Sequence, residues 1–264
     1  MSGEKRKYTW LQGLNIVGLI GMVIVNFLAN YLPINNLDTG EIADLYPNLY
    51  TPAGFTFSIW GLIYLLLIVF VIYQGKSILN SDSKQLNYVY RIGYLFFTSC
   101  VLNISWIFAW HYLQVGLSLI IMLLLLINLI MLYKRLNVNK VQEKGELLTR
   151  ISFSVYLGWI TIATVANVII FLVDIGWWQS GLPEVFWMVG AVIIASVIVI
   201  LFMQKNKDWV YSLVAIWAYF GIIVKRLQTE PVEVAVVIVV GLAMIVIAGF
   251  IYQMVKSSEQ LWSG

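Results

Sequence analysis

The sequence predicts an all-α, polytopic membrane protein: a transmembrane helix bundle of about eight spans. Of the 264 residues, 61% are hydrophobic and only 11% are charged, whereas a soluble domain of this size is about 25% charged. The apolar residues also form continuous runs of roughly 20 residues, which is the length of a helix that crosses a hydrocarbon core of about 30 Å. Strands of a membrane barrel would instead alternate polar and apolar residues over short segments.

The apolar segments follow one another along the chain with mostly brief loops between them. We expect spans at residues 10–33, 53–73, 89–112, 115–133, 149–173, 185–203, 209–225 and 232–255. Basic residues precede the first segment as in a signal sequence, but the apolar run is too long and no A-x-A-like cleavage site follows. We therefore interpret residues 10–33 as the first span.

The basic residues predict the orientation of these spans. With the N-terminus inside, nearly all Lys and Arg residues fall on the cytoplasmic side, and only Lys225 and Arg226 fall on the other side. This asymmetry follows the positive-inside rule. We expect an integral protein of a bacterial plasma membrane, with both termini cytoplasmic. The lipid bilayer is its expected partner, and the small net charge of +3 does not indicate nucleic-acid binding.

The reactive side chains are few. A single cysteine, Cys100, and a single histidine, His111, exclude paired-cysteine and multi-histidine metal motifs. Acidic residues such as Asp174 and Glu184 lie at span ends, so the spans contain no carboxylate relay. We expect no metal and no required cofactor. His111 is most simply an interfacial residue, and a role as single axial ligand of a tetrapyrrole metal is left open.

Three spans carry aromatic residues on one helical face. These residues are spaced by three, four or seven positions, so that each set lies within a narrow stripe: Phe57, Trp60 and Tyr64; Asn103, Trp106 and Trp110; and Tyr156, Trp159, Ala163 and Asn167. An aromatic belt and ordinary packing are the simplest interpretation. Because an unpaired amide in hydrocarbon costs a few kcal/mol, Asn103 and Asn167 should face the interior, where they link helices or contact a ligand. An aromatic interior with a few polar groups suits a flat, largely apolar ligand.

Three motifs resemble those of one family. Residues 50–64 (YTPAGFTFSIWGLIY) look like the second-span signature of the tryptophan-rich sensory proteins, the TspO family that includes the mitochondrial translocator protein. Residues 103–106 (NISW) and residues 156–167 (YLGWITIATVAN) are similar to its third-span and fifth-span motifs. The chain departs from the family at Val155, where proline is usual, and at Tyr50, where tryptophan is common.

The resemblance implies a five-helix bundle over residues 1–175, with residues 176–264 as an additional three-span region. It also implies a pocket between helices, closed by the loop between spans 1 and 2, that binds porphyrins or other tetrapyrroles. A homodimer is suggested by analogy alone. From the stripes and the resemblance together, the expected ligand-binding residues are Phe57, Trp60, Tyr64, Asn103, Trp106, Tyr156, Trp159, Ala163 and Asn167.

The leading functional hypothesis is a receptor or sensor that binds a porphyrin-like ligand. One alternative is a transporter of tetrapyrroles or small hydrophobic molecules, for which Gly190, Gly221 and Gly241 would allow close helix approach. Another is light-dependent degradation of a porphyrin. We assign no catalytic residue; if such degradation occurs, Trp60 and Trp159 are the expected reactants. A purely structural partner protein is the fourth option.

Overall fold

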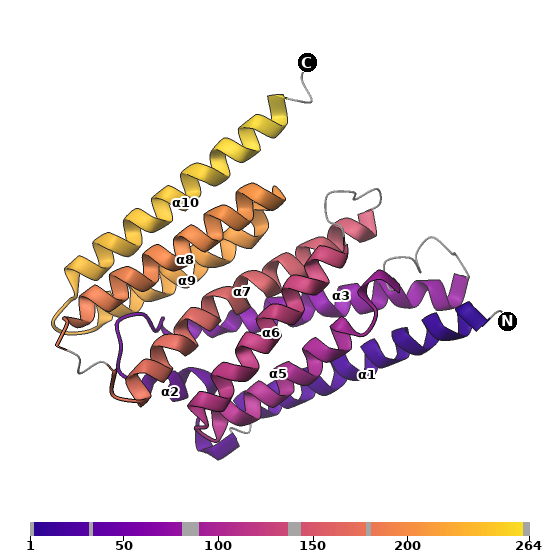
Figure 1. Ribbon diagram of the computed structural model, residues 1–264, viewed down its shortest axis with the longest axis horizontal. Helices are drawn as coiled ribbons and strands as arrows, with labels where there is room; N and C mark the ends of the chain where they lie inside the picture. Colours follow the sequence, from indigo (N-terminus) through magenta and orange to yellow (C-terminus); the bar gives the residue numbers. More distant parts are fainter. Residues whose placement is uncertain (1–2, 32–33, 81–89, 137–143, 178–180, 261–264) are drawn as a thin grey trace. The chain divides into compact units, whose positions relative to one another are not determined.

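The computed structural model describes residues 3–31, 34–80, 90–136, 144–177 and 181–260, and all regular structure within these ranges is helical (Figure 1). Three short helices, η1 (Ile34–Asn36), α2 (Thr39–Asp44) and η2 (Gly54–Ser58), lie between the first two long ones. The long helices are α1 (Gly3–Tyr31), α3 (Ile59–Asn80), α5 (Leu95–His111), α6 (Val115–Leu136), α7 (Lys144–Asp174), α8 (Glu184–Asn206), α9 (Trp209–Gln228) and α10 (Val234–Gln260). The predicted all-α bundle is confirmed.

Each of the eight predicted spans overlaps one of these long helices. Among the described residues, seven helices are long and apolar enough to cross a membrane, and the shorter α5 lies in the remaining predicted span. The third predicted span, residues 89–112, is longer than the helix found there, because α5 begins only at Leu95. Gly93 adopts a left-handed conformation with φ of 58°, which ends the short helical turn before it.

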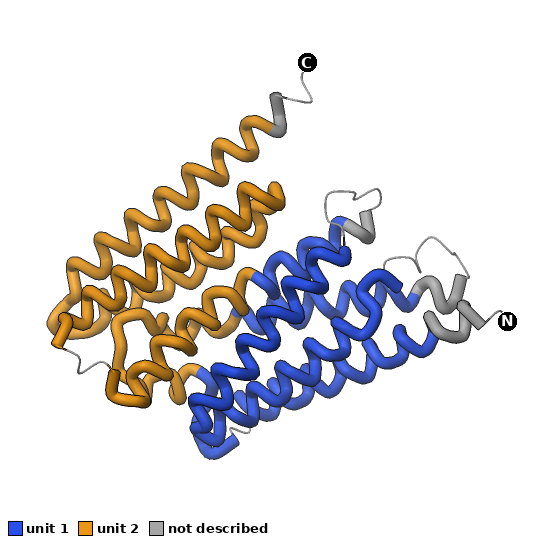
Figure 2. The backbone as a smooth tube through the Cα atoms, in the orientation of Figure 1, with its two compact units in different colours: residues 1–39, 59–157 blue, residues 40–58, 158–264 orange. Residues whose placement is uncertain are grey.

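The chain divides into two compact units, which are described separately here (Figure 2). Unit 1 consists of residues 1–39 and 59–157, and unit 2 consists of residues 40–58 and 158–264. Helix α7 contributes its first part to unit 1 and its second part to unit 2. These units are defined by packing, whereas the predicted boundary after residue 175 rests on the family resemblance and stays a prediction.

Unit 1 has an aromatic core and buried amide contacts between its helices. The rings of Phe70, Phe96 and Phe153, from α3, α5 and α7, pack edge to face with centroids 5.0–5.9 Å apart. Asn15 Nδ2 of α1 donates to Gln74 Oε1 of α3 over 3.0 Å. Because hydrocarbon offers no water to pair with an amide, such contacts hold membrane helices together.

Unit 2 is held by hydroxyl contacts and one close helix approach. Tyr211 Oη donates to Thr161 Oγ1 over 2.8 Å, which links α9 to α7. Gly221 of α9 packs directly on η2: its carbonyl accepts from Ala53 N over 3.1 Å, and a Cβ built on it would lie 3.0 Å or less from three atoms of Thr56. Gly190 and Gly241 have nothing within 4 Å of such a Cβ, so of the three glycines considered above only Gly221 permits a close approach.

We predict that Gly221→Ala lowers the free energy of unfolding by about 1–3 kcal/mol, because the added methyl group overpacks the contact with Thr56. The matched control is Gly241→Ala, whose methyl group meets open space and removes a flexible residue from a helix. Thermal unfolding of the purified protein in detergent measures both. Equal effects of the two substitutions would contradict the close approach.

Candidate ligand-binding site

Five aromatic residues of unit 1 form a continuous set of ring contacts, which we call the aromatic cluster: Trp60, Tyr64, Trp106, Trp110 and Tyr156. Trp60 is at its centre. Its ring stacks on Tyr64 with centroids 5.7 Å apart, lies 6.2 Å from Trp106, and meets Tyr156 edge to face at 6.1 Å. Trp106 in turn stacks on Trp110 at 5.7 Å. The structure thus brings together Trp60 and Tyr64 of the second-span stripe, Trp106 and Trp110 of the third-span stripe, and Tyr156 of the fifth-span stripe. Phe57 of the second-span stripe lies in η2 and outside the cluster.

Polar atoms are buried beside this cluster. Asn103 is fully buried, and its Oδ1 accepts from Asn26 Nδ2 of α1 over 2.7 Å. Its Nδ2 has no hydrogen-bond partner in the described part of the chain, and the same is true of the hydroxyls of Tyr64 and Tyr156. The Tyr156 hydroxyl faces the Asn103 amide without forming a hydrogen bond of normal geometry. Asn103 therefore links two helices and still offers a donor.

One of the five residues of the aromatic cluster is partly exposed at the protein surface. Trp60, Trp106, Trp110 and Tyr156 are buried, whereas Tyr64 is half-buried. Tyr64 is thus the residue at which the cluster meets its surroundings. Each buried polar atom without a partner costs on the order of 1–3 kcal/mol, and three such atoms lie beside this one group of stacked rings.

The other four predicted ligand-binding residues belong to unit 2. Phe57 and Trp159 form an edge-to-face pair with centroids 5.9 Å apart and rings inclined at 86°. Asn167 is buried, and its Nδ2 donates to the carbonyl of Ala163, one turn earlier in the same helix, over 3.0 Å. This nitrogen bonds to the backbone of its own helix, whereas the oxygen of Asn103 pairs with another helix.

His111 has a structural environment that the sequence did not indicate. The ring is fully buried at the end of α5. Its Nδ1 lies 3.1 Å from the carbonyl of Ile34, and its Nε2 lies 3.4 Å from Thr39 Oγ1. A proton on Nδ1 lets the ring donate to Ile34 and accept from Thr39. Both nitrogens then have partners within the protein.

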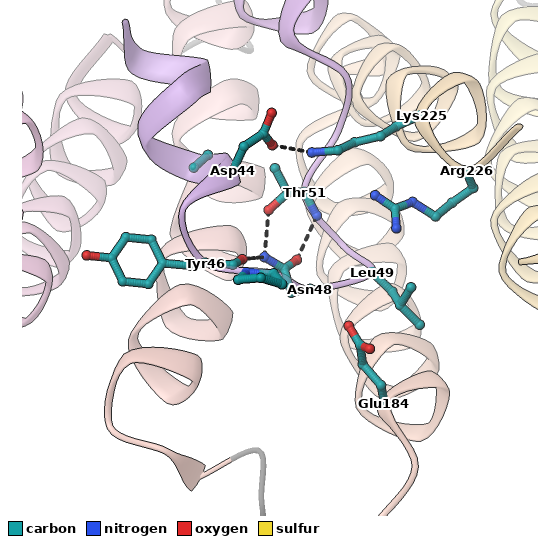
Figure 3. Close-up of a pocket in the computed structure, with 10 residues that line it drawn as sticks. Asp44, Tyr46, Asn48, Leu49, Thr51, Glu184, Lys225 and Arg226 are labelled. Atoms are coloured by element: carbon teal, nitrogen blue, oxygen red, sulfur yellow. Dashed lines mark hydrogen bonds and ion pairs between the residues drawn. The ribbon is translucent and has the colours of Figure 1, made fainter. Parts of the chain in front are cut away.

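Unit 2 contains a pocket of ≈ 320 Å³, which we call the loop pocket (Figure 3). It lies where α2 and the segment after it meet the start of α8 and the end of α9. The lining residues are Ala43, Asp44, Tyr46, Pro47, Asn48, Leu49, Thr51, Glu184, Lys225 and Arg226.

Asn48 stabilises the turn of the loop segment, residues 46–51, that lines this pocket. Its Oδ1 accepts from the backbone nitrogens of Tyr50 and Thr51 over 2.9 and 2.8 Å. Its Nδ2 donates to the carbonyl of Tyr46 over 2.8 Å and to Thr51 Oγ1 over 2.7 Å. An asparagine that bonds the backbone two or three residues ahead is typical of a tight turn. Burial raises the pKa of the neighbouring Tyr50 phenol well above its ordinary value, so this side chain stays neutral.

Four charged side chains surround the pocket. Lys225 Nζ forms an ion pair with Asp44 Oδ1, and Figure 3 joins these two atoms. Arg226 is 7% exposed and interacts electrostatically with Glu184. None of these four residues was predicted from the sequence to belong to a site. One sequence feature could have indicated this pocket: Lys225 and Arg226 are the only basic residues on the non-cytoplasmic side of the predicted topology.

Apolar helices of membrane-spanning length, with amides and tyrosine hydroxyls buried between them, define a polytopic α-helical integral membrane protein. More particularly, the chain belongs to the family of TSPO-like proteins, whose family model matches residues 11–252. This confirms the resemblance seen in the sequence motifs, and the match continues through the last three long helices rather than ending near residue 175. Comparisons with curated proteins and with solved structures gave no match.

We predict that Tyr64→Phe raises the free energy of unfolding of the unliganded protein by about 1 kcal/mol, because it removes a buried hydroxyl that has no partner. The matched control is Tyr211→Phe, which removes a hydroxyl that donates to Thr161 and should lower this free energy by about 1 kcal/mol. Thermal unfolding in detergent distinguishes the two signs. A loss of stability in Tyr64→Phe would show that its hydroxyl has a partner.

Proposed function

We propose that this TSPO-like membrane protein is a receptor that binds a flat, largely apolar ligand of the porphyrin type at the aromatic cluster. The observation that carries the proposal is the combination of stacked indole and phenol rings with three buried polar atoms that have no partner. No other set of buried groups described in unit 1 combines these two properties.

The aromatic cluster supplies the two interactions that such a ligand needs. Planar rings gain about 0.5–1.5 kcal/mol per aromatic contact beyond the burial of their area. Trp60 and Trp106 offer two large ring systems inclined at 32° to each other. A tetrapyrrole has an extended apolar plane for these rings and polar edge groups that hydrogen bonds can orient.

The polar atoms would orient the ligand. Asn103 Nδ2 can only donate, whereas the hydroxyls of Tyr64 and Tyr156 can donate or accept. A carboxylate or carbonyl at the ligand edge would accept from them and remove the cost of leaving these groups unpaired. Tyr64, the half-buried member, is the expected point of entry, because the other rings of the cluster are buried.

Tryptophan fluorescence titrated with protoporphyrin IX tests this function. We expect saturable quenching of the wild type, and at least tenfold weaker binding in the double variant Trp60→Phe, Trp106→Phe, since both stacking surfaces are reduced. Trp209→Phe, which changes an exposed tryptophan of unit 2, is the matched control and should bind like the wild type. Absorbance of the bound porphyrin gives a readout that does not depend on the number of tryptophans.

Two results would contradict the proposal. One is quenching that rises without saturation, as expected for porphyrin dissolved in the detergent. The other is an equal loss of affinity in Trp209→Phe and in the double variant. Retained binding by the double variant together with normal folding would place the ligand elsewhere in the protein.

We also propose that the protein lies in a bacterial plasma membrane with both termini cytoplasmic. The support is the excess of Lys and Arg in the segments that this topology makes cytoplasmic. A C-terminal fusion to a reporter that folds only in the cytoplasm should be active, and a fusion after residue 231, between α9 and α10, should be inactive. The reverse pattern would invert the topology.

A further inference from the structure

The two neighbouring cations in the last turn of α9 have different surroundings. Lys225 is paired with Asp44, and its side chain is about one fifth exposed, at 21%. Arg226 is 7% exposed, and its buried Nε has no hydrogen-bond partner in the part of the chain that the structure describes. Figure 3 shows its guanidinium extending from α9 toward the loop segment that carries Thr51, with no dashed contact to any lining residue.

A buried guanidinium whose Nε has no hydrogen-bond partner is energetically unfavourable. Moving a charge out of water is unfavourable unless hydrogen bonds and an opposite charge replace the lost hydration. Asp44, the nearest acidic residue of α2, is already used by Lys225. Glu184 and Glu233 both attract Arg226 electrostatically, and Figure 3 draws no ion pair between Arg226 and Glu184. The side chain of Asn48 is fully occupied in holding the turn and supplies no acceptor.

From this geometry we propose that the loop pocket binds the phosphate group of a small ligand, with Arg226 as its anchor. The planar guanidinium presents N–H donors in a fork that matches two oxygens of a phosphate, and such charge-assisted bonds are about twice as strong as neutral ones. Lys225 lines the same pocket but is paired with Asp44, so Arg226 supplies the positive charge for the phosphate. The site lies wholly in unit 2 and does not depend on the aromatic cluster.

Size and position limit the ligand. A volume of ≈ 320 Å³ is at the small end of ligand pockets, so it admits a phosphate ester of headgroup size. The pocket is built from the start of α8 and the end of α9, which are the ends of two apolar spans. Both a lipid headgroup and a soluble phosphate ester can reach such a position, and the chemistry at Arg226 is the same for each.

Glu184 sets the strength of binding. Its carboxylate lines the pocket and interacts with Arg226, so it repels a phosphate and competes for the same guanidinium. Arg226 and Glu184 should therefore act in opposite directions. Arg226→Lys keeps the positive charge but loses the fork, and Glu184→Gln keeps the shape but removes the negative charge.

The test measures thermal unfolding of the full chain with two probes. The soluble probe is glycerol 3-phosphate added to the protein in a non-ionic detergent, with ionic strength held constant by sodium chloride. The lipid probe is phosphatidylglycerol at increasing fractions in nanodiscs of phosphatidylcholine. A ligand that binds the folded state raises the unfolding midpoint in a saturable way. Lys205→Gln, which removes an exposed cation at the other end of α8, is the control for net charge.

We expect a saturable rise for the wild type and for Lys205→Gln with at least one probe. We expect about tenfold weaker binding in Arg226→Lys, roughly the value of one charge-assisted hydrogen bond, and severalfold tighter binding in Glu184→Gln. A response to glycerol 3-phosphate identifies a soluble ester, and a response to phosphatidylglycerol alone identifies a lipid headgroup. The proposal is overturned if neither probe gives saturation, if Arg226→Lys binds like the wild type, or if Glu184→Gln binds more weakly.

Discussion

In the hydrocarbon of a bilayer a polar group finds no water, so each amide and hydroxyl between the helices has to be paired inside the protein. Much of this structure follows from that constraint. Asn26 pairs with Asn103, and Asn15 pairs with Gln74, each across two helices. Hydroxyls return to the carbonyls of their own helix, as Thr164 does with Ile160. The first two contacts link helices to each other, and the third satisfies a hydroxyl within its own helix.

Buried polar groups without partners are exceptions to this constraint. Within the described residues several of them gather at two places, beside the aromatic cluster of unit 1 and in the loop pocket of unit 2. At the cluster they are neutral groups next to stacked rings, which suits a flat molecule with polar edges. In the pocket the group is the charged Arg226, which suits an anion. The two proposed ligands therefore differ because the unpaired groups at the two places differ in charge.

The aromatic cluster was largely predictable because it depends on local periodicity. A helix turns by a fixed angle per residue, so the spacing of Trp60 and Tyr64, or of Asn103 and Trp106, already places each pair on one face. The spacing of four positions between Trp60 and Tyr64, and between Trp106 and Trp110, does not depend on how the helices pack. The environment of His111 was harder to predict. Its partners are the carbonyl of Ile34 and the hydroxyl of Thr39, both more than 70 positions away in the chain.

The sequence by itself determined that this is a helical membrane protein of the TSPO-like family, since length, apolar content and motif spacing are properties of single helices. Tertiary structure decided which polar groups found partners. Lys225 and Arg226 are chemically similar neighbours, yet α2 supplies Asp44 to the first and leaves the second buried without a hydrogen bond at Nε. The physical reason is that hydrogen bonding depends on atoms of remote segments, whose positions relative to one another are set only when the helices and the loop pack together.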